Sequence, residues 1–349
     1  MEGKACSNLR GSERSIELTA NHASPCWVSD MRIVGIASET EIYSPDDSYF
    51  SFYNSPYVSH GQGSSVDIYP FHQSWQDIVV SPVSGKVVKI KKMKMGRPKE
   101  FPTHRNDFGI AIQPEHTDKD IVRILHCDPT VSVGDRVDLG DSIGKTLRSR
   151  FFNYWTGPHY HVEVMDLESF ERSSQSYPFK QLFRFPPREG LKESANIEYE
   201  ISQVTRDFVK GFPRNIEHST ISDLIGLAAK SQEDVNFGIL DGGISHYKQG
   251  GVVGGVNIKS NSVVYFAGKP VGTIADSHRF IRGPVISSTL DGKDLRGLSC
   301  FIYPEVYTKK GVPPLILVPN EYDQFSDTII EGDVCLLEIN SKNNMIKAE

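Results

Sequence analysis

The sequence predicts a mostly β protein, in which an antiparallel β-sandwich or barrel-like domain is followed by a second β-rich (α+β) domain. Short runs rich in valine and isoleucine recur along the chain, and Gly, Pro, Asp and Ser residues separate them, as is typical of strands joined by turns. Only one segment shows clear helical spacing of apolar residues. With 349 residues, the chain is long enough for two domains that each bury a core.

Strand signals are strongest in the first half of the chain. The run from Ile78 to Ile90 predicts two strands joined at a Ser-Gly turn. Glycines between Val131 and Gly144 are spaced so that the backbone can turn twice around a compact loop. Further strands are expected over residues 108–113, 121–126 and 160–165. This half should therefore form an antiparallel β domain.

Prolines mark the expected boundary between the domains. Pro178, Pro186 and Pro187 punctuate a segment of weak periodicity, which predicts a linker. Beyond it, Thr220 to Ser231 has helical apolar spacing after a capping candidate, so we expect a helix there. Strands are expected over residues 252–258, 262–266, 271–274, 315–318 and 334–339. We expect the first domain to span residues 43–168, with the strands and loops of residues 1–42 packing on it. A linker is expected over 169–190 and a β-rich accessory domain over 191–349.

Composition and charge exclude several classes of protein. The net charge of −6 gives no general electrostatic reason to expect nucleic-acid binding, and the basic run from Lys89 to Lys99 fits a solvated hairpin. Five scattered cysteines without a CxxC pair favour reduced thiols over a disulfide framework. Neither a secretory signal nor a stretch apolar enough to span a bilayer is visible, so we expect a cytoplasmic protein without a membrane partner. The sequence does not indicate an oligomeric state.

Two histidines in the segment TGPHYHVEV are the sharpest candidates for chemistry. His159 and His161 lie two residues apart at the start of an expected strand, so their side chains project to the same face. One imidazole could hold a metal while the other handles a proton. An HxH pair alone is also what two surface histidines would look like.

An upstream loop offers two further ligands. His60 and Asp67 flank a Gly/Ser-rich segment shortly before the β region. Two histidine nitrogens and one aspartate oxygen form an open zinc set, whose fourth position is left to water that can attack a polarised carbonyl. His126 ends the expected strand 121–126, just before the double turn, where a strand end could bring it to the same rim.

Together these segments resemble the lysostaphin-type zinc metallopeptidases, also described as LytM-like or duplicated hybrid motif peptidases. Their pattern is an H-x-G-x-D element, a strand ending in His, a V-x-x-G-D-x-V-x-x-G-x-x-I-G turn and then T-G-P-H-L-H-F-E-V. This chain carries His60 and Asp67, then SPVSGKVV, then LHCDPTVSVGDRVDLGDSIG, then TGPHYHVEV, in the same order. The resemblance spans roughly Tyr43 to Met165, within the first half only.

The resemblance implies an activity and a role for each residue. His60, Asp67 and His161 would be the ligands of one Zn²⁺ ion, whereas His126 and His159 would be the catalytic pair that handles the water and stabilises the tetrahedral intermediate. The reaction would be hydrolysis of a peptide amide, with a peptide or a peptidoglycan-like amide as substrate. The expected fold is the β-sandwich of that family.

The match departs from the family pattern at the first element. Six residues separate His60 from Asp67, where the pattern has three, and an inserted loop would account for the difference. This makes Asp67 the least secure ligand, and His72 is the alternative. Tyr154, near the site in sequence, could donate a hydrogen bond to an oxyanion or could be a packed aromatic.

Two other functions are compatible with parts of the sequence. A non-catalytic binding or regulatory module could keep a lysostaphin-like fold without turnover. A biotinyl or lipoyl carrier shares the GD-G turn, and Met93-Lys94-Met95 resembles the biotin-accepting tripeptide, but here it precedes the turn rather than following it. A carrier would also leave the histidines without a role. No family resemblance was found for residues 191–349.

Overall fold

The structure is a computed structural model, and most of the chain can be described. The described residues are 30–71, 74–180, 182, 188–189, 197–244, 246–247, 249–254, 258–276, 279–282 and 286–341. Within them the protein is mostly β, and every pairing between its strands is antiparallel. None of the helices in the described ranges is long and apolar enough to cross a membrane.

The first half is built on a seven-stranded sheet in the order β10-β6-β7-β8-β12-β4-β3. Its strands are β3 (Tyr49–Ser51), β4 (Ser65–Tyr69), β6 (Gly85–Lys94), β7 (Asn106–Pro114), β8 (Asp120–Leu125), β10 (Arg136–Val137) and β12 (Tyr160–Asp166). A three-stranded sheet consists of β13 (Phe179–Lys180), β1 (Met31–Ala37) and β2 (Thr40–Pro45). A second consists of β5 (Ile78–Val80), β11 (Ser142–Thr146) and β9 (Cys127–Pro129). Helical turns are α1 (Val58–Gly61), η1 (Leu167–Ser169) and η2 (Ser173–Gln175).

Alternation along the central strands gives the seven-stranded sheet two different faces. Val162 and Val164 of β12 belong to the large apolar core of this half. His161 and Glu163 alternate with them along the same strand, and successive side chains of a strand point to opposite faces. One face of the sheet therefore packs the core, while the other carries the polar side chains of the candidate site.

The second half forms two closed rings of strands that share one apolar core. The first ring joins β18 (Leu224–Lys230), β21 (Val263–Phe266), β22 (Lys269–Ile274), β23 (Arg279–Arg282), β20 (Gln249–Val253) and β19 (Asn236–Ile244). The second joins β25 (Lys293–Cys300), β24 (Ile286–Leu290), β28 (Val334–Ser341), β15 (Ile197–Val204), β16 (Val209–Pro213) and β27 (Leu315–Pro319). Pairing of β19 with β25 connects the rings. Outside them lie β14 (Arg188–Glu189), β17 (His218–Ile221), β26 (Tyr303–Pro304) and η3 (Glu305–Tyr307).

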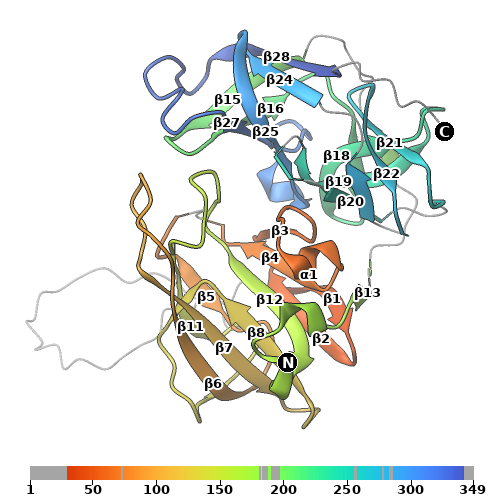
Figure 1. Cartoon of the computed structure of the whole chain (residues 1–349). Coiled ribbons are helices and arrows are strands. Elements are labelled where there is room, and N and C mark those ends of the chain that lie inside the picture. The colour runs from red at the N-terminus through yellow and green to blue at the C-terminus, as the bar shows by residue number, and fades with distance from the viewer. Residues whose placement is uncertain are drawn as a thin grey trace, which may run out of the picture.

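The two halves meet along β3 and β4, as Figure 1 shows. Phe50 of β3 exchanges two backbone hydrogen bonds with Ile302 of the second half, at 3.1 and 3.0 Å. Ile302 also packs in the apolar core of the first half, together with Ile239 and Val253 from the first ring. This shared core fixes how the second half sits over the polar face of the seven-stranded sheet.

Asp241 of β19 ties the second half to the backbone just before α1. Its fully buried carboxylate accepts hydrogen bonds from the backbone N–H groups of Phe52 (2.7 Å) and Tyr53 (3.2 Å) and from the Ser51 hydroxyl (2.5 Å). Tyr53 packs so closely against Gly251 that a Cβ there would lie 2.0 Å from its ring. Both contacts require close approach of the two halves.

The fold class predicted from the sequence is confirmed, and so are the strands expected at 78–90, 108–113, 121–126 and 160–165. The helix expected over Thr220 to Ser231 is wrong, because this segment forms the end of β17, a turn and then β18. Every residue of β18 is buried, so its apolar residues do not alternate. A strand buried on both faces cannot be distinguished from a helix by apolar spacing alone.

Several other expectations have a structural counterpart. Within the expected linker 169–190, β13 pairs with β1 of the first half. Cys127, Cys300 and Cys335 are buried free thiols, whereas Cys6 and Cys26 lie outside the described residues. Lys94, the candidate carrier lysine, ends β6, where it pairs with Asn106. The expected domain limits stay a prediction.

Replacing Asp241 by alanine should destabilise the protein by about 3 kcal/mol, because two buried backbone N–H groups and a hydroxyl would lose their acceptor. Urea unfolding followed by tryptophan fluorescence measures this change. Asp294→Ala is the matched control, since Asp294 is exposed on β25. Equal unfolding midpoints for the two variants would contradict the assigned role of Asp241.

Candidate metal centre

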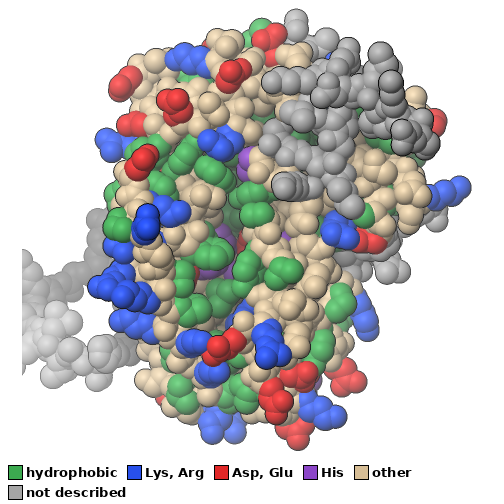
Figure 2. Space-filling view, in the orientation of Figure 1, with side chains coloured by type: hydrophobic (Ala, Val, Ile, Leu, Met, Phe, Trp, Pro, Cys, Tyr) green, Lys and Arg blue, Asp and Glu red, His purple; other side chains and the backbone are tan. Residues whose placement is uncertain are grey.

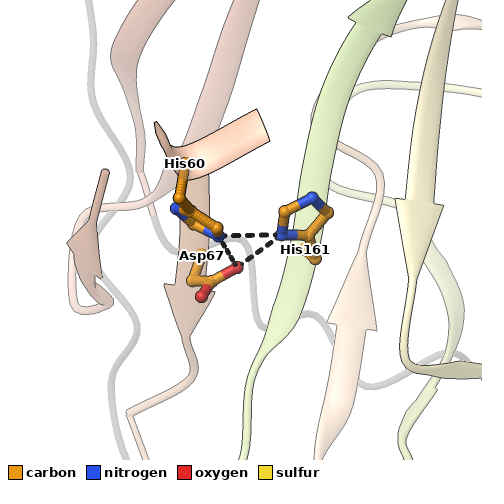
Figure 3. A group of neighbouring side chains, drawn as sticks. All are labelled: His60, Asp67 and His161. Atoms are coloured by element: carbon orange, nitrogen blue, oxygen red, sulfur yellow. Dashed lines mark hydrogen bonds and ion pairs between the residues drawn. The ribbon is translucent and has the colours of Figure 1, made fainter. Parts of the chain in front are cut away.

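His60, Asp67 and His161 converge on one point at the boundary between the halves. His60 Nε2 lies 3.1 Å from His161 Nδ1 and 3.1 Å from Asp67 Oδ1, and His161 Nδ1 lies 2.7 Å from the same oxygen. Figure 3 shows these three atoms facing one another from α1, β4 and β12. All three side chains are buried.

The strand register explains how residues so distant in sequence meet. His161 pairs directly with Asp67 across β12 and β4, which places the two side chains on the same face. The segment between His60 and Asp67 completes α1 and turns back through Gly63, whose φ of 64° suits glycine. The six-residue spacing therefore brings His60 over the strand pair.

Hydrogen bonds on the far side of each ring fix which nitrogen carries a proton. His60 Nδ1 lies 2.6 Å from the Phe52 carbonyl oxygen, and His161 Nε2 lies 2.6 Å from Glu163 Oε1. Each of these nitrogens must donate its N–H, since the partner is an acceptor. In the neutral rings, His60 Nε2 and His161 Nδ1 therefore point lone pairs at each other and at Asp67.

Three lone-pair atoms facing one another in a buried site require a cation between them. Ligand atoms about 2.0–2.2 Å from a tetrahedral zinc lie about 3.3 Å apart, close to the spacing seen here. Two imidazole nitrogens and one carboxylate oxygen are a typical zinc donor set. These are the residues of the described chain whose donor atoms cluster tightly enough, within 4.8 Å, to hold a metal.

The protonation of the group favours the same conclusion. Burial raises the pKa of Asp67, but His60, His159 and His161 outweigh it and hold that pKa well below its usual range. Burial lowers the pKa of His161, but hydrogen bonds to Asp67 and Glu163 raise it overall to about 9. Without a metal, the shared cation is therefore a proton on His161.

A buried ion pair supports His161 from behind. Glu163 Oε2 accepts a hydrogen bond from Arg123 Nη2 at 2.6 Å, and Arg123 Nη2 also lies 2.6 Å from Ser173 Oγ. Burial raises the pKa of Glu163, but His161 and Arg123 lower it overall to about 2. The ionised Glu163 can therefore orient His161, as outer carboxylates do for metal-bound histidines.

His126 lies beside the cluster and has an aspartate partner of its own. It follows β8 with a φ of 65°, a left-handed conformation that histidine adopts more readily than most residues. Its Nδ1 lies 2.7 Å from Asp107 Oδ2, which also accepts a 2.7 Å hydrogen bond from Ser149. Because Asp107 fixes Nδ1–H, Nε2 is the nitrogen available for proton transfer.

His159 is neutral and borders the same cluster. Burial is the main reason that its pKa is lowered to about 4. Its Nδ1 donates to the Gly157 carbonyl oxygen at 2.9 Å, and its Nε2 lies 3.7 Å from Asp67 Oδ2. The His126 and His159 rings are 5.4 Å apart. A substrate group between them could exchange protons with either ring.

A cavity of about 230 Å³ opens onto these side chains. In Figure 2 histidine side chains are visible in the hollow between the halves, with hydrophobic side chains around them. Its polar floor contains Asp67, His126, His159 and His161. Around the floor lie residues from both halves: Tyr49, Asn54, Ser55, Pro56, Tyr57, Tyr69, Phe151, Phe152, Asn153, Trp155, Thr156, Gly157, Pro158, Phe208, Tyr247, Ser299, Phe301 and Ile316.

Tyr154, considered from the sequence as an oxyanion contact, lies outside the cavity lining. The Tyr154 hydroxyl donates to the carbonyl oxygens of Pro319 (2.9 Å) and Asn320 (2.8 Å), and Tyr154 is not among the residues lining the cavity. Its side chain therefore packs against the second half. His72, the alternative ligand, lies outside the described residues.

Two supporting carboxylates were not identified from the sequence. Glu163 lies two residues after His161 on the same strand, so strand alternation could have placed it beside that ring. Asp107 lies 19 positions before His126, and no local pattern links the two residues. Only the pairing of β7 with β8 brings them together.

Comparisons with known proteins give two family matches. Residues 39–181 match the family described as "Domain of unknown function (DUF8155) N-terminal domain", and residues 215–315 match the DUF8155 C-terminal domain. The two matches put both DUF8155 domains in one chain, in that order. No curated protein matches the sequence.

Among solved structures, the chain is similar to one titled "NMR solution structure of lysostaphin". The identity is 15% and the TM-score 0.22, with 68% of this chain and 95% of that chain covered. A TM-score of this size does not by itself establish a shared fold.

Zinc binding should release a proton at neutral pH. Since the pKa of His161 is raised to about 9, the metal-free site holds a proton that zinc must displace. Zinc affinity should therefore rise about tenfold per pH unit between pH 7 and 9 and level off above that range. Calorimetric titration in two buffers of different ionisation enthalpy measures the proton release. A pH-independent affinity would contradict this protonation state.

Glu163→Gln should lower zinc affinity about 10- to 100-fold, because the charge is lost and the amide N–H₂ group must face either His161 or Arg123, which are both donors. Zinc competition with a chromophoric chelator measures the affinity. Glu168→Gln is the matched control, since Glu168 is exposed on the turn after β12. If both variants bound zinc equally well, Glu163 would not be an orienting group.

Proposed function

We propose that this protein is a zinc-dependent hydrolase of peptide amide bonds, with His60, Asp67 and His161 as metal ligands. One observation carries the proposal. Outer hydrogen bonds from His60 to the Phe52 carbonyl and from His161 to the Glu163 carboxylate aim two imidazole lone pairs at a buried carboxylate oxygen, on the floor of a cavity. An arrangement that needs a cation and has room for a substrate beside it is typical of a catalytic metal site.

Three protein ligands leave a coordination position for water or substrate. When bound there, zinc would supply a Lewis acid that polarises a carbonyl group and makes water acidic enough to attack it near neutral pH. The ligand set carries one negative charge, on Asp67, because both histidines are neutral when they ligate. The centre would therefore keep a net positive charge, which stabilises an oxyanion.

His126 is the proposed proton carrier. Asp107 holds Nδ1–H at 2.7 Å, so Nε2 can take a proton from the attacking water, and the ionised Asp107 then stabilises the charged ring. The same nitrogen can return that proton to the leaving amine. This arrangement resembles the oriented His-Asp pairs of other hydrolases.

His159 is proposed to stabilise the oxyanion of the tetrahedral intermediate or to orient the water. Its ring is buried and neutral, and its Nδ1–H is committed to the Gly157 carbonyl oxygen. With Nδ1 as the donor, Nε2 accepts a hydrogen bond from water. In this tautomer His159 therefore orients the water, and it can donate to an oxyanion only when Nε2 has taken a proton.

The choice of a peptide amide as substrate rests on the ordered motifs. His60, His126 and the TGPHYHVEV segment follow the order of the lysostaphin-type peptidases. Asp67, His126, His159 and His161 line one cavity, and His60 lies against Asp67 and His161. A peptide or a peptidoglycan-like amide is the proposed partner, and the second half is proposed as an accessory domain.

Metal content and turnover separate the two roles. His161→Ala should purify with little zinc, whereas His126→Ala should keep its zinc and cleave a peptide that the wild type cleaves about 10²- to 10⁴-fold more slowly. Metal analysis and a fluorogenic peptide assay measure the two effects. The exposed His116→Ala variant is the control for both.

Each failure has a distinct meaning. Near-zero zinc in wild type and His161→Ala alike would contradict the metal assignment. Full activity in His126→Ala would exclude that residue as the proton carrier. A zinc-loaded wild type that cleaves no peptide would instead favour a non-catalytic binding module with the same site.

A further inference from the structure

Part of the cavity wall is built by the second half of the chain. Its members come from the segments around β16, β19, β25 and β27, and they are Phe208, Tyr247, Ser299, Phe301 and Ile316. We infer that this wall, called here the apolar wall, binds an uncharged, apolar side chain of the substrate next to the bond that is cleaved. The inference rests on the proposed function.

The apolar wall is continuous with the reacting groups. Tyr69 packs 5.0 Å from the His159 ring, and Phe301 packs edge-on against Tyr69 with the ring centres 4.9 Å apart. His159 itself borders Asp67. A substrate whose carbonyl reached the proposed metal position would therefore place the neighbouring side chain along these aromatic rings.

The charge of the lining favours an uncharged occupant. None of the described residues that line the cavity is a lysine, an arginine or a glutamate. Asp67 is the carboxylate there, and the histidines and the proposed zinc already neutralise it. Burial raises the pKa of Tyr247 to about 12, so its hydroxyl is neutral. Along the apolar wall, a charged side chain would lose its hydration without gaining a partner of opposite charge.

The polar atoms of the apolar wall already interact with protein groups. The Tyr247 hydroxyl accepts a 3.2 Å hydrogen bond from Trp155 Nε1, and the Ser299 hydroxyl lies 3.3 Å from His246 Nε2. The surface they present to the cavity is therefore mainly ring and methyl carbon. Such a surface gains free energy by covering apolar substrate area and little by binding a polar group.

Size and rigidity fit an aromatic or branched aliphatic side chain. A cavity of about 150 Å³ lined by apolar side chains is enough to hold benzene. The 230 Å³ found here leaves space for such a ring beside a metal-binding group. Phe208, Phe301 and Ile316 are each less than a tenth exposed, since they pack in one cluster with Tyr49 and Tyr69. The apolar wall is thus formed before a ligand arrives.

Three hydroxamates that share one zinc-binding group test the inference. Acetohydroxamate, 3-phenylpropionohydroxamate and succinate monohydroxamate carry a methyl, a phenylethyl and a carboxyethyl group. Their binding to the zinc-loaded full chain is measured by titration calorimetry, with the metal-free protein as reference. The phenyl compound should bind about tenfold or more tightly than acetohydroxamate, because it buries its ring. The succinate compound should bind no more tightly than acetohydroxamate.

Variants then locate the preference on the apolar wall. Ile316→Ser should reduce the preference for the phenyl compound severalfold and leave acetohydroxamate binding and zinc content unchanged. Ile330→Ser is the matched control, since Ile330 lies in the same half and is 68% exposed. Thermal unfolding checks that both variants fold. If Ile316→Ser does not fold, the three compounds measured on the wild type still test whether the site prefers an apolar side chain.

The outcomes separate this inference from the proposed function. Equal, zinc-dependent binding of all three compounds would overturn the apolar wall as a side-chain subsite and leave the metal centre intact. Tightest binding of the succinate compound would also overturn it. If zinc-loaded protein bound none of the three compounds, the open coordination position of the proposed function would be contradicted, and the inference with it.

Discussion

The pairing of His161 with Asp67 across β12 and β4 is the constraint on which the site depends. It brings an imidazole and a carboxylate together on the polar face of the seven-stranded sheet, while alternate residues of the same strands build the core. A shift of one residue in the register of β12 would turn His161 into the apolar core and leave Asp67 alone on the polar face. The register of β12 against β4 therefore determines both the packing of the sheet on its core and the geometry of the candidate metal centre.

Groups behind the ligands determine what the cluster can bind. The Phe52 carbonyl and the Glu163 carboxylate accept hydrogen bonds from the outer N–H groups of His60 and His161. The lone pairs of the other two ring nitrogens therefore face Asp67. Asp107 does the same for His126, which is oriented for proton transfer rather than for ligation. Such outer partners commonly fix the tautomer and ring orientation of functional histidines. The same kind of outer hydrogen bond thus orients all three imidazoles, and His126 differs in role because it lies outside the cluster of ligand atoms.

The second half takes part in the site as well as in the fold. Asp241 accepts hydrogen bonds from the Ser51 hydroxyl and from the backbone N–H groups of Phe52 and Tyr53, and the Phe52 carbonyl accepts a hydrogen bond from His60. Phe301 and Ile316 face the cavity from the same half. The candidate metal ligands and the apolar wall are consequently held in place by one interface between the two halves.

The sequence by itself determined the β class, most strands and, through strand alternation, the common face of His159 and His161. It wrongly predicted a helix over Thr220 to Ser231, because the residues of β18 are all buried and apolar spacing does not distinguish such a strand from a helix. It also left open whether six intervening residues would let Asp67 meet His60. Only the tertiary structure showed that Asp67 meets His60, that Asp107 and Glu163 pair with His126 and His161, and that the apolar wall borders the cavity. These contacts depend on strand register and on packing between the halves, which the local sequence does not encode.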